Sequence, residues 1–260
     1  MKETVLITGA SSGIGLELAK CFAADKANLI LVARTTAAME NLAAELRAEH
    51  SIETHVITAD LAQPDTAQKI FDELKEGRGI SVDVLVNNAG FGLHGSFAEL
   101  PLHHQLEIIQ VNITALVALT GLFLPEIIQR KRGGILNVGS VAGFFPGPNM
   151  AVYYASKAFV LSFSEALHEE LRGTDIHVTN ICPGPTATNF SQIARSHRVR
   201  ETQVGKMTAA AVARIGYEDF RQDNCLSVTG WKNKLLAAVG TTALPRAAAR
   251  KLVKHYNTLK

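Results

Sequence analysis

The sequence has few cysteines, and this scarcity narrows the kinds of site that it can build. The 260 residues include only Cys21, Cys182 and Cys225, and none of them belongs to a CxxC pair. This pattern argues against a disulfide framework and against a zinc site, and it suits a reducing cytoplasm, where we expect the protein to reside. We also predict no bound metal and no nucleic-acid partner.

Long hydrophobic runs are missing as well. The N-terminal segment reaches Gly9 after a short apolar stretch, so we do not expect a signal peptide. The most apolar later stretch, residues 113–128, contains a proline and two threonines and is shorter than a membrane-spanning helix requires. We interpret it as a helix buried in the core of a globular protein.

Acidic residues are absent from the end of the chain. Residues 231–260 contain seven Lys and Arg side chains and no Asp or Glu, whereas the whole chain has a net charge of +2. Such a segment is either a solvated basic face or a surface for an anionic partner, such as a phospholipid surface or an acidic carrier. We favour the solvated face.

Short apolar runs alternate with longer segments of helical pattern. The runs are rich in Val, Ile and Leu, as in parallel strands that are covered on both faces. They occupy residues 4–9, 28–34, 54–60, 82–90, 133–140 and 176–184. The alternation predicts a doubly wound α/β sheet of the Rossmann type, with ligands bound outside the carboxyl ends of the strands. No linker interrupts it, so we expect a single domain over residues 1–260.

A glycine-rich turn, TGASSGIG, follows the first strand at residues 8–15. Gly9, Gly13 and Gly15 allow a tight turn and a close approach of the backbone to a ligand. The helix that follows offers N–H groups and its positive dipole end to a pyrophosphate. The spacing differs from the GxGxxG fingerprint, and a plain tight turn would also explain it.

The end of the second strand indicates which dinucleotide would bind. A site that prefers NAD usually has an acidic residue there, whereas an arginine accommodates the 2′-phosphate of NADP. Here Ala33 is followed by Arg34, and the first acidic residue, Glu40, lies in the next helix. We therefore predict a preference for NADPH over NADH, although a routine surface arginine would look the same.

Two adjacent tyrosines lie at the start of a helix that we predict over residues 150–173. Side chains four residues apart share a helix face, so Tyr153 meets Lys157, whereas Tyr154 points elsewhere and should tolerate phenylalanine. An ammonium beside a phenol favours the phenolate, so we expect Lys157 to lower the pKa of Tyr153 toward the range of a general acid. A purely structural contact between the two is the alternative.

Taken in order, these motifs resemble those of the short-chain dehydrogenase/reductase family over about residues 4 to 190. The turn matches the TGxxxGxG motif, Asn87 to Gly90 match the NNAG segment, and Tyr153 and Lys157 match the YxxxK pair. Ser140 stands thirteen positions before the tyrosine, a usual family spacing. The last thirty residues are also similar to a bacterial branch near the ketoacyl and hydroxysteroid reductases.

The resemblance implies seven parallel strands, NAD(P)-dependent interconversion of an alcohol and a carbonyl, and a homodimer or homotetramer. Tyr153 would transfer the proton, Ser140 would bind the substrate oxygen, and Lys157 would hold the nicotinamide ribose. Asn112 would anchor a water in a proton relay. The cofactor would contact Gly9, Ser11, Ser12, Gly13, Ile14, Gly15, Arg34, Asp60, Leu61, Asn87, Ala89, Gly90, Tyr153, Lys157, Pro183, Gly184, Thr186 and Thr188.

One position departs from the pattern of the NADP-preferring members. Some of them carry a basic residue just before the second glycine of the turn, where this chain has Ser12. The 2′-phosphate would therefore depend largely on Arg34.

The substrate side is predicted to be mostly apolar. Its expected walls are Phe91, His94, Phe144, Phe145, Met150 and Phe190. Residues 188–207 match the variable substrate loop of the family and contain Arg195, Arg198, Arg200 and Lys206. This composition favours an NADPH-dependent reductase of a lipophilic ketone or 3-ketoacyl compound. A dehydrogenase of a small polar alcohol or hydroxy acid and a non-enzymatic NADP-binding protein are the alternatives.

The segment after the substrate loop is expected to end in two short helices, within residues 231–260 and broken at GTTALP. One interpretation docks them on a membrane surface through Trp231, Leu235 and Leu236, with the lysines at the headgroups. Packing at a subunit interface or over the active site is the interpretation that we favour.

Overall fold

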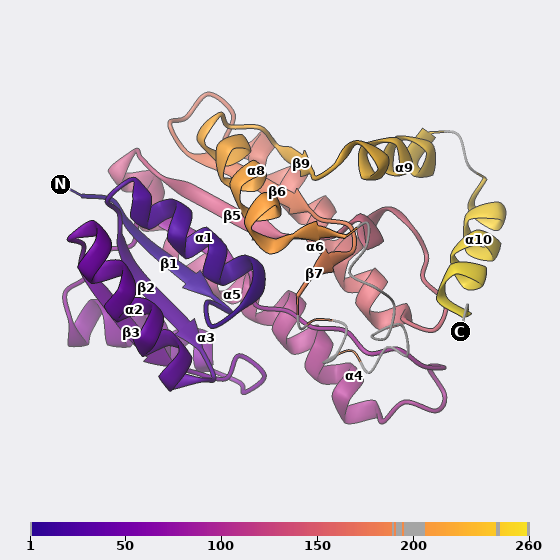
Figure 1. The fold of residues 1–260 in the computed structure, drawn as a ribbon, viewed down its shortest axis with the longest axis horizontal. Coiled ribbons are helices and arrows are strands. Elements are labelled where there is room, and N and C mark those ends of the chain that lie inside the picture. Colours follow the sequence, from indigo (N-terminus) through magenta and orange to yellow (C-terminus); the bar gives the residue numbers. More distant parts are fainter. Residues whose placement is uncertain (1, 189, 191–193, 195–205, 243–244, 259–260) are drawn as a thin grey trace.

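A seven-stranded parallel sheet forms the centre of the molecule (Figure 1). The computed structural model describes residues 2–188, 190, 194, 206–242 and 245–258. The strands, in the order β3-β2-β1-β4-β5-β6-β9, are β3 (Thr54–Thr58), β2 (Asn28–Ala33), β1 (Thr4–Thr8), β4 (Val84–Asn87), β5 (Gly134–Val138), β6 (His177–Cys182) and β9 (Leu226–Val228). The predicted Rossmann-type sheet is confirmed.

Helices cover both faces of this sheet. One face is covered by α1 (Gly13–Ala24), α2 (Thr36–His50) and α8 (Ala209–Arg221). The other face is covered by α3 (Thr66–Asp72), α5 (Ala115–Arg130) and α6 (Ala151–Glu170). The remaining elements are η1 (Glu73–Gly77), α4 (Leu102–Ile109), η2 (Gln110–Thr114), η3 (Val141–Phe144), β7 (Thr186–Ala187), β8 (Met207–Thr208), α9 (Trp231–Thr242) and α10 (Arg246–Thr258).

The strand sequences are apolar because helices cover both faces of the sheet. Side chains of successive strand residues point to opposite faces. In β1, Val5 and Ile7 join the core beneath α1, and Leu6 joins the core beneath α5. All three are fully buried, so neither face of the strand has room for a polar residue.

The strand order reverses at β1, and this reversal positions the site. β1 pairs with β2 on one side and with β4 on the other, and both pairings are parallel. The glycine turn follows β1 and the NNAG segment follows β4, so the two motifs meet at the carboxyl ends of adjacent strands. This is the crevice in which doubly wound sheets bind their ligands.

Within the described residues, Leu102–Arg130 is the segment that is long and apolar enough to cross a membrane, judged by length and composition alone. It comprises α4, the π-helical turn η2 and α5. Phe123 and Ile127 on its inner face are buried in the core, whereas Leu106 and Val117 on its outer face are exposed. The prediction of a buried helix over residues 113–128 therefore holds for one face of α5 only.

Two helices, α9 and α10, follow the last strand, as predicted (Figure 1). Ala249 and Val253 of α10 are buried against Phe145, with Phe144 and Tyr154 packed alongside. Because Phe145 and Tyr154 also line the large pocket described below, α10 covers the substrate side of the site. This contact agrees with the favoured interpretation of packing over the active site.

Candidate active site

A pocket of about 1080 Å³ extends along the carboxyl ends of the strands. Its lining begins at Arg34 beyond β2, passes Gly9 and Ser140, and ends at Val253 on α10. The volume is at the upper end of ordinary ligand sites, and the lining comes from segments throughout the chain. The pocket therefore has room for an extended cofactor and a second molecule beside it.

The glycine turn has the backbone geometry that a pyrophosphate site needs. Gly9 and Gly13 have φ values of +65° and +58°, a backbone conformation that residues other than glycine rarely adopt. A Cβ on Gly15 would lie 2.4 Å from the carbonyl oxygen of Gly9, so Gly15 serves the packing of the turn and does not line the pocket. α1 starts at Gly13, and the side chain of Ser12 makes no capping hydrogen bond. The N–H groups of the first turn thus suit an anionic ligand.

The NNAG segment holds this turn in place. The Thr8 hydroxyl accepts hydrogen bonds from the backbone N–H groups of Asn88 and Ala89, both at 3.0 Å. Asn88 Nδ2 donates to the carbonyl oxygens of Thr8 (2.8 Å) and Gly9 (3.1 Å). Asn88, which our sequence reasoning did not single out, therefore connects the two loops and also lines the pocket.

The side chain of Asn87 does not reach the pocket, and the cofactor contact assigned to this residue stays a prediction. It is buried, and its Nδ2 donates to Thr120 Oγ1 at 3.1 Å and to Asn137 Oδ1 at 3.0 Å. Because Asn87 is the last residue of β4, its side chain points into the core, and the following asparagine faces the ligand side.

At the far end of the pocket lie the residues predicted to bind the adenosine half. Arg34 is exposed, lines the pocket and has no salt-bridge partner among the described residues. Asp60 Oδ1 accepts the N–H of Ala62 at 3.0 Å, so this carboxylate shapes its own turn while lining the pocket. Leu61 is buried beside it and also lines the pocket.

The remaining cofactor residues predicted from the sequence, apart from Gly15 and Asn87, also line this pocket. They are Gly9, Ser11, Ser12, Gly13, Ile14, Ala89, Gly90, Tyr153, Lys157, Pro183, Gly184, Thr186 and Thr188. They come from the chain segments after β1, β4 and β6 and from the helices α1 and α6, yet they border one continuous space. The residues present therefore fit an extended dinucleotide.

Tyr153, Lys157 and Ser140 come together in the middle of the pocket. Tyr153 and Lys157 lie one turn apart on α6, and both are more than nine-tenths buried. Ser140 follows β5 and hydrogen-bonds to Tyr153. Lys157 Nζ donates to the carbonyl oxygen of Val138 at 2.7 Å. The predicted trio thus shares one site, and the last residue of β5 binds one of its members, Lys157.

The pKa of Tyr153 differs from the expectation. Burial raises it from 10.0 to about 12, because the phenolate loses its hydration, and the hydrogen bond with Ser140 acts in the opposite direction. Lys157 is not among the groups that lower it. Burial also lowers the pKa of Lys157 from 10.5 to about 8. In the free protein, desolvation outweighs the attraction between the two groups that the spacing suggested.

Asn112 lies behind this trio, inside the π-helical turn η2. It is only 2% exposed, so a solvent-facing asparagine is excluded. Its amide bonds both backbone groups of Phe91, at 3.1 and 3.0 Å, and donates to Ser156 Oγ at 2.9 Å. A Cβ on Gly90 would lie 3.0 Å from Asn112 Oδ1 and 3.4 Å from Lys157 Nζ. Asn112 therefore fixes the loop after β4 close to the lysine, outside the pocket lining.

Cofactor binding should depend on pH through Lys157. Its pKa of about 8 means that the free protein holds the charged lysine below pH 8 and loses its proton above that value. If the charged form holds the cofactor, binding above pH 8 must take up a proton, and the Kd of NADPH should rise by up to about tenfold per pH unit. Calorimetry at pH 9 in buffers of different ionisation enthalpy should show uptake of close to one proton, against almost none at pH 7.

Lys157→Met provides the control for this linkage. The variant should bind NADPH with no proton uptake at either pH. Uptake at pH 9 that persists in the variant would assign the titration to another group.

The predicted substrate walls are largely in place. Phe91, His94, Phe145, Met150 and Phe190 line the pocket, whereas Phe144 packs behind it between two small clusters and is a correction to the prediction. Of the substrate loop, Arg195, Arg198 and Arg200 lie outside the described residues, and Lys206 lines the pocket.

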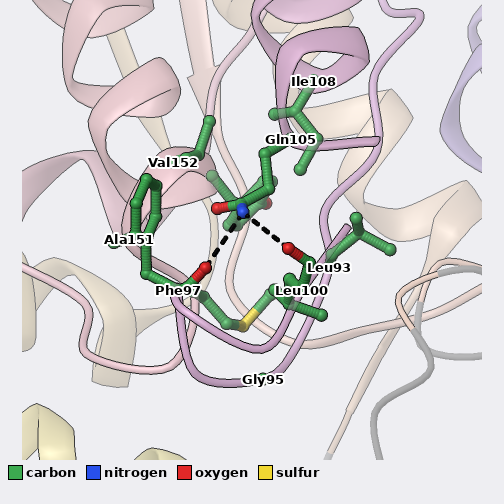
Figure 2. Close-up of a pocket in the computed structure, with 10 residues that line it drawn as sticks. Leu93, Gly95, Phe97, Leu100, Gln105, Ile108, Ala151 and Val152 are labelled. Carbon is green, nitrogen blue, oxygen red and sulfur yellow. Dashed lines mark hydrogen bonds between the residues drawn. The ribbon is translucent and has the colours of Figure 1, made fainter. Parts of the chain in front are cut away.

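A buried glutamine supports one of these walls (Figure 2). Gln105 is 4% exposed, and its Nε2 donates to the carbonyl oxygens of Phe97 and Leu100, both at 3.1 Å. Gly95 N in the same loop donates to the carbonyl oxygen of Asn149 at 2.8 Å. These bonds hold the loop after β4 against the start of α6, beside Tyr153.

Asn257 of α10 is a pocket residue that sequence reasoning missed. Its Nδ2 donates to the carbonyl oxygen of Pro148 at 2.8 Å, and its own carbonyl oxygen bonds His94 Nε2 at 2.8 Å. The Tyr154 hydroxyl approaches its Oδ1 at 3.5 Å. These contacts join α10 to both loops of the substrate side, and no local sequence signal predicts such distant pairs.

Comparison with known proteins places this arrangement among characterised relatives. Residues 3–199 match the sequence profile described as short chain dehydrogenase. A very-long-chain 3-oxoacyl-CoA reductase of Phaeosphaeria nodorum is 37% identical over 218 residues, which cover 81% of this chain and 63% of that protein. Dehydrogenase/reductase SDR family member 7B of Mus musculus is 37% identical over 190 residues, 72% of this chain and 58% of that protein. The chain thus matches less than two thirds of the length of these two relatives.

Solved structures agree over nearly the full chain. A short-chain dehydrogenase from Sphingobium yanoikuyae in complex with NADPH has a TM-score of 0.82 and 33% identity, and 92% of each chain is covered. A bulky-bulky ketone specific alcohol dehydrogenase from Comamonas testosteroni has a TM-score of 0.77 and 32% identity, over 96% of this chain and 98% of that one.

Proposed function

Because the chain belongs to the short-chain dehydrogenase family and is an NAD(P)-dependent oxidoreductase, we propose that it reduces a lipophilic ketone with NADPH. A 3-oxoacyl thioester is the leading candidate for that ketone. The observation that carries this proposal is the apolar wall beyond Tyr153. Phe145, Met150 and Val253 line the pocket there, and burying a hydrocarbon group against such side chains is favourable.

The preference for NADPH is supported by the end of β2. Arg34 lines the pocket without a salt-bridge partner among the described residues, and a guanidinium suits a phosphate better than a free hydroxyl. The Sphingobium yanoikuyae relative has been solved with NADPH.

The substrate class is supported by the relatives as well as by the pocket. The fungal relative is named for very-long-chain 3-oxoacyl-CoA, and the Comamonas testosteroni relative for bulky ketones. Both substrates place a carbonyl beside large apolar groups. This shared chemistry matches the wall that α10 adds to the pocket.

In the proposed mechanism, the residues from the glycine turn to Thr188 would hold the cofactor, which would supply a hydride for the carbonyl carbon. The hydroxyls of Ser140 and Tyr153 donate hydrogen bonds to the carbonyl oxygen, where negative charge develops. Tyr153 then transfers its proton to that oxygen. Its raised pKa keeps the phenol protonated at neutral pH, which is the form that reduction needs. Lys157 would return a proton to the tyrosine from the solvent side, through a water that Asn112 would anchor.

The deciding experiment measures NADPH consumption with ketones that are graded by chain length and charge. kcat/KM should rise with hydrocarbon length, since each buried CH₂ contributes up to about 0.8 kcal/mol. A preference for short polar ketones or hydroxy acids would favour the second candidate function. NADPH binding with no turnover of any carbonyl would contradict the proposal and leave a binding protein.

The outer face of α4 and α5, with that of α6, is the surface proposed for the homodimer or homotetramer. Leu106, Val117 and Phe159 are 54, 37 and 38% exposed, respectively. Light scattering should give the mass of a dimer or a tetramer of the 28.0 kDa chain. The double variant Val117→Lys with Phe159→Lys should reduce this mass to that of one chain. A monomeric wild type would contradict this assignment.

A further inference from the structure

The outward face of α9 carries two large apolar side chains that the fold leaves uncovered. Trp231 is 72% exposed and Leu235 is 60% exposed. They are four residues apart, so they lie on the same face of the helix. Ala237, on another face, is buried against Val228 and Cys182, so α9 is held to the body and presents the other two residues outward. Neither Trp231 nor Leu235 lines the large pocket.

Basic side chains flank this apolar pair on α9, and further basic side chains are exposed on α10. Lys232 and Lys234 flank it on α9, and the Nζ of Lys232 lies 5.6 Å from the centroid of the Trp231 ring. Arg250, Lys251 and Lys254 are exposed on α10. In the described parts of α9 and α10, none of these five cations has an acidic partner within salt-bridge distance. The segment contains no Asp or Glu that could provide one.

The same two helices form the apolar rim of the pocket. Leu236 of α9 and Leu252 and Tyr256 of α10 line the pocket, yet they are 40, 52 and 48% exposed. Asn257 holds α10 against both substrate-side loops, so this rim has a fixed position. The pocket therefore opens beside the uncovered apolar and basic surface.

We propose that α9 and α10 form a docking surface for an anionic phospholipid membrane. Trp231 and Leu235 would enter the interfacial region, and the lysines and arginines would lie at the lipid phosphates. Tryptophan favours this region because its ring is apolar and its N–H is polar. A second copy of the chain on this face would bring like charges together, whereas an anionic bilayer matches both the charge and the apolar pair. Docking would place the mouth of the pocket at the membrane.

The test uses Trp231 itself, because it is the only tryptophan in the chain. The full-length protein is titrated with vesicles of phosphatidylcholine alone and with vesicles containing about a third phosphatidylglycerol. The emission should shift to shorter wavelength, and the protein should sediment, with the phosphatidylglycerol vesicles only. Added salt should weaken the binding, because surface charges are screened within about a Debye length.

Two variants separate the charge and the apolar contributions. Lys232→Glu with Lys234→Glu should weaken vesicle binding by about a hundredfold or more, given roughly 1 kcal/mol for each basic residue near the surface. Leu235→Ser should weaken it by about tenfold, through lost apolar burial. Lys69→Glu with Arg172→Glu makes the same charge change on α3 and in the turn after α6, and this variant should bind vesicles like the wild type. NADPH binding should be unchanged in all of them, which verifies folding.

Several outcomes would overturn the proposal. They include no emission shift with phosphatidylglycerol vesicles, equal binding to both vesicle types, and unchanged binding by the Lys232 and Lys234 variant. An emission wavelength that depends on protein concentration and not on lipid would assign the face to a second copy. These results do not depend on turnover, so they can be distinguished from a failure of the proposed reductase function.

Discussion

Phenylalanine at position 153 should reduce kcat by about a hundred- to ten-thousandfold, the usual contribution of a positioned general acid. The change removes only the hydroxyl that bonds Ser140, and the ring of Tyr153 would keep its packing against Phe190, with centroids 5.2 Å apart. The pocket should therefore retain its shape, and the affinity for NADPH should stay within a few-fold of the wild type. Steady-state kinetics with the preferred ketone and cofactor binding by fluorescence measure the two quantities.

Tyr154→Phe is the matched control, since it removes the same atom from the neighbouring residue. Tyr154 packs with Phe145 and Val253, and its hydroxyl lies 3.5 Å from Asn257 Oδ1. Its kcat should remain within about threefold of the wild type. Full turnover by Tyr153→Phe would refute the assignment of the proton donor, and an equal loss in both variants would point to packing damage.

Removal of the guanidinium at position 34 should change the choice of cofactor. Charge-assisted hydrogen bonds contribute about 1.5–3 kcal/mol each, so Arg34→Ala should raise the KM for NADPH by about ten- to a hundredfold. The KM for NADH should hardly change, because NADH has no 2′-phosphate for the arginine to contact. The ratio of kcat/KM for the two cofactors is the measurement.

Arg47→Ala controls for the loss of positive charge near the same edge of the sheet. Arg47 lies on α2 and bonds Thr54 Oγ1, and it does not line the pocket. This variant should keep the wild-type cofactor ratio. Equal use of NADH and NADPH by the unmodified protein would remove the role given to Arg34.

The fold was predictable where the strand segments are strongly apolar along their length. Six of the seven strands are apolar runs that end at glycine, polar or charged residues, and the alternation with helices indicated a parallel sheet. β9 was missed in the pattern because it has only three residues, Leu226–Val228, one of them a serine. It exists because β6 offers it an edge, through pairs such as Ile181 with Ser227. The pairing of so short a segment with a strand that is distant in sequence cannot be predicted from the segment's own residues.

The candidate site was predictable in its motifs but not in the direction of every side chain. β4 is buried on both faces, so no alternation of polar and apolar residues tells which of Asn87 and Asn88 faces the ligand. The pKa of Tyr153 was misjudged for a related reason. Spacing reveals the neighbouring Lys157, whereas the burial that dominates the value arises only when the whole pocket closes around it.

The position of α10 in the chain has a consequence for the order in which the protein matures. The predicted cofactor-site residues lie between Gly9 and Thr188, so they leave the ribosome well before the helix that covers the substrate side. At translation rates of about 5–20 residues per second, several seconds separate these two stretches. During this interval Tyr153 has its helix and its strand but not the wall that Val253 and Asn257 provide. The part of the wall that would bind a large substrate is therefore synthesised after the proposed proton donor and the predicted cofactor residues.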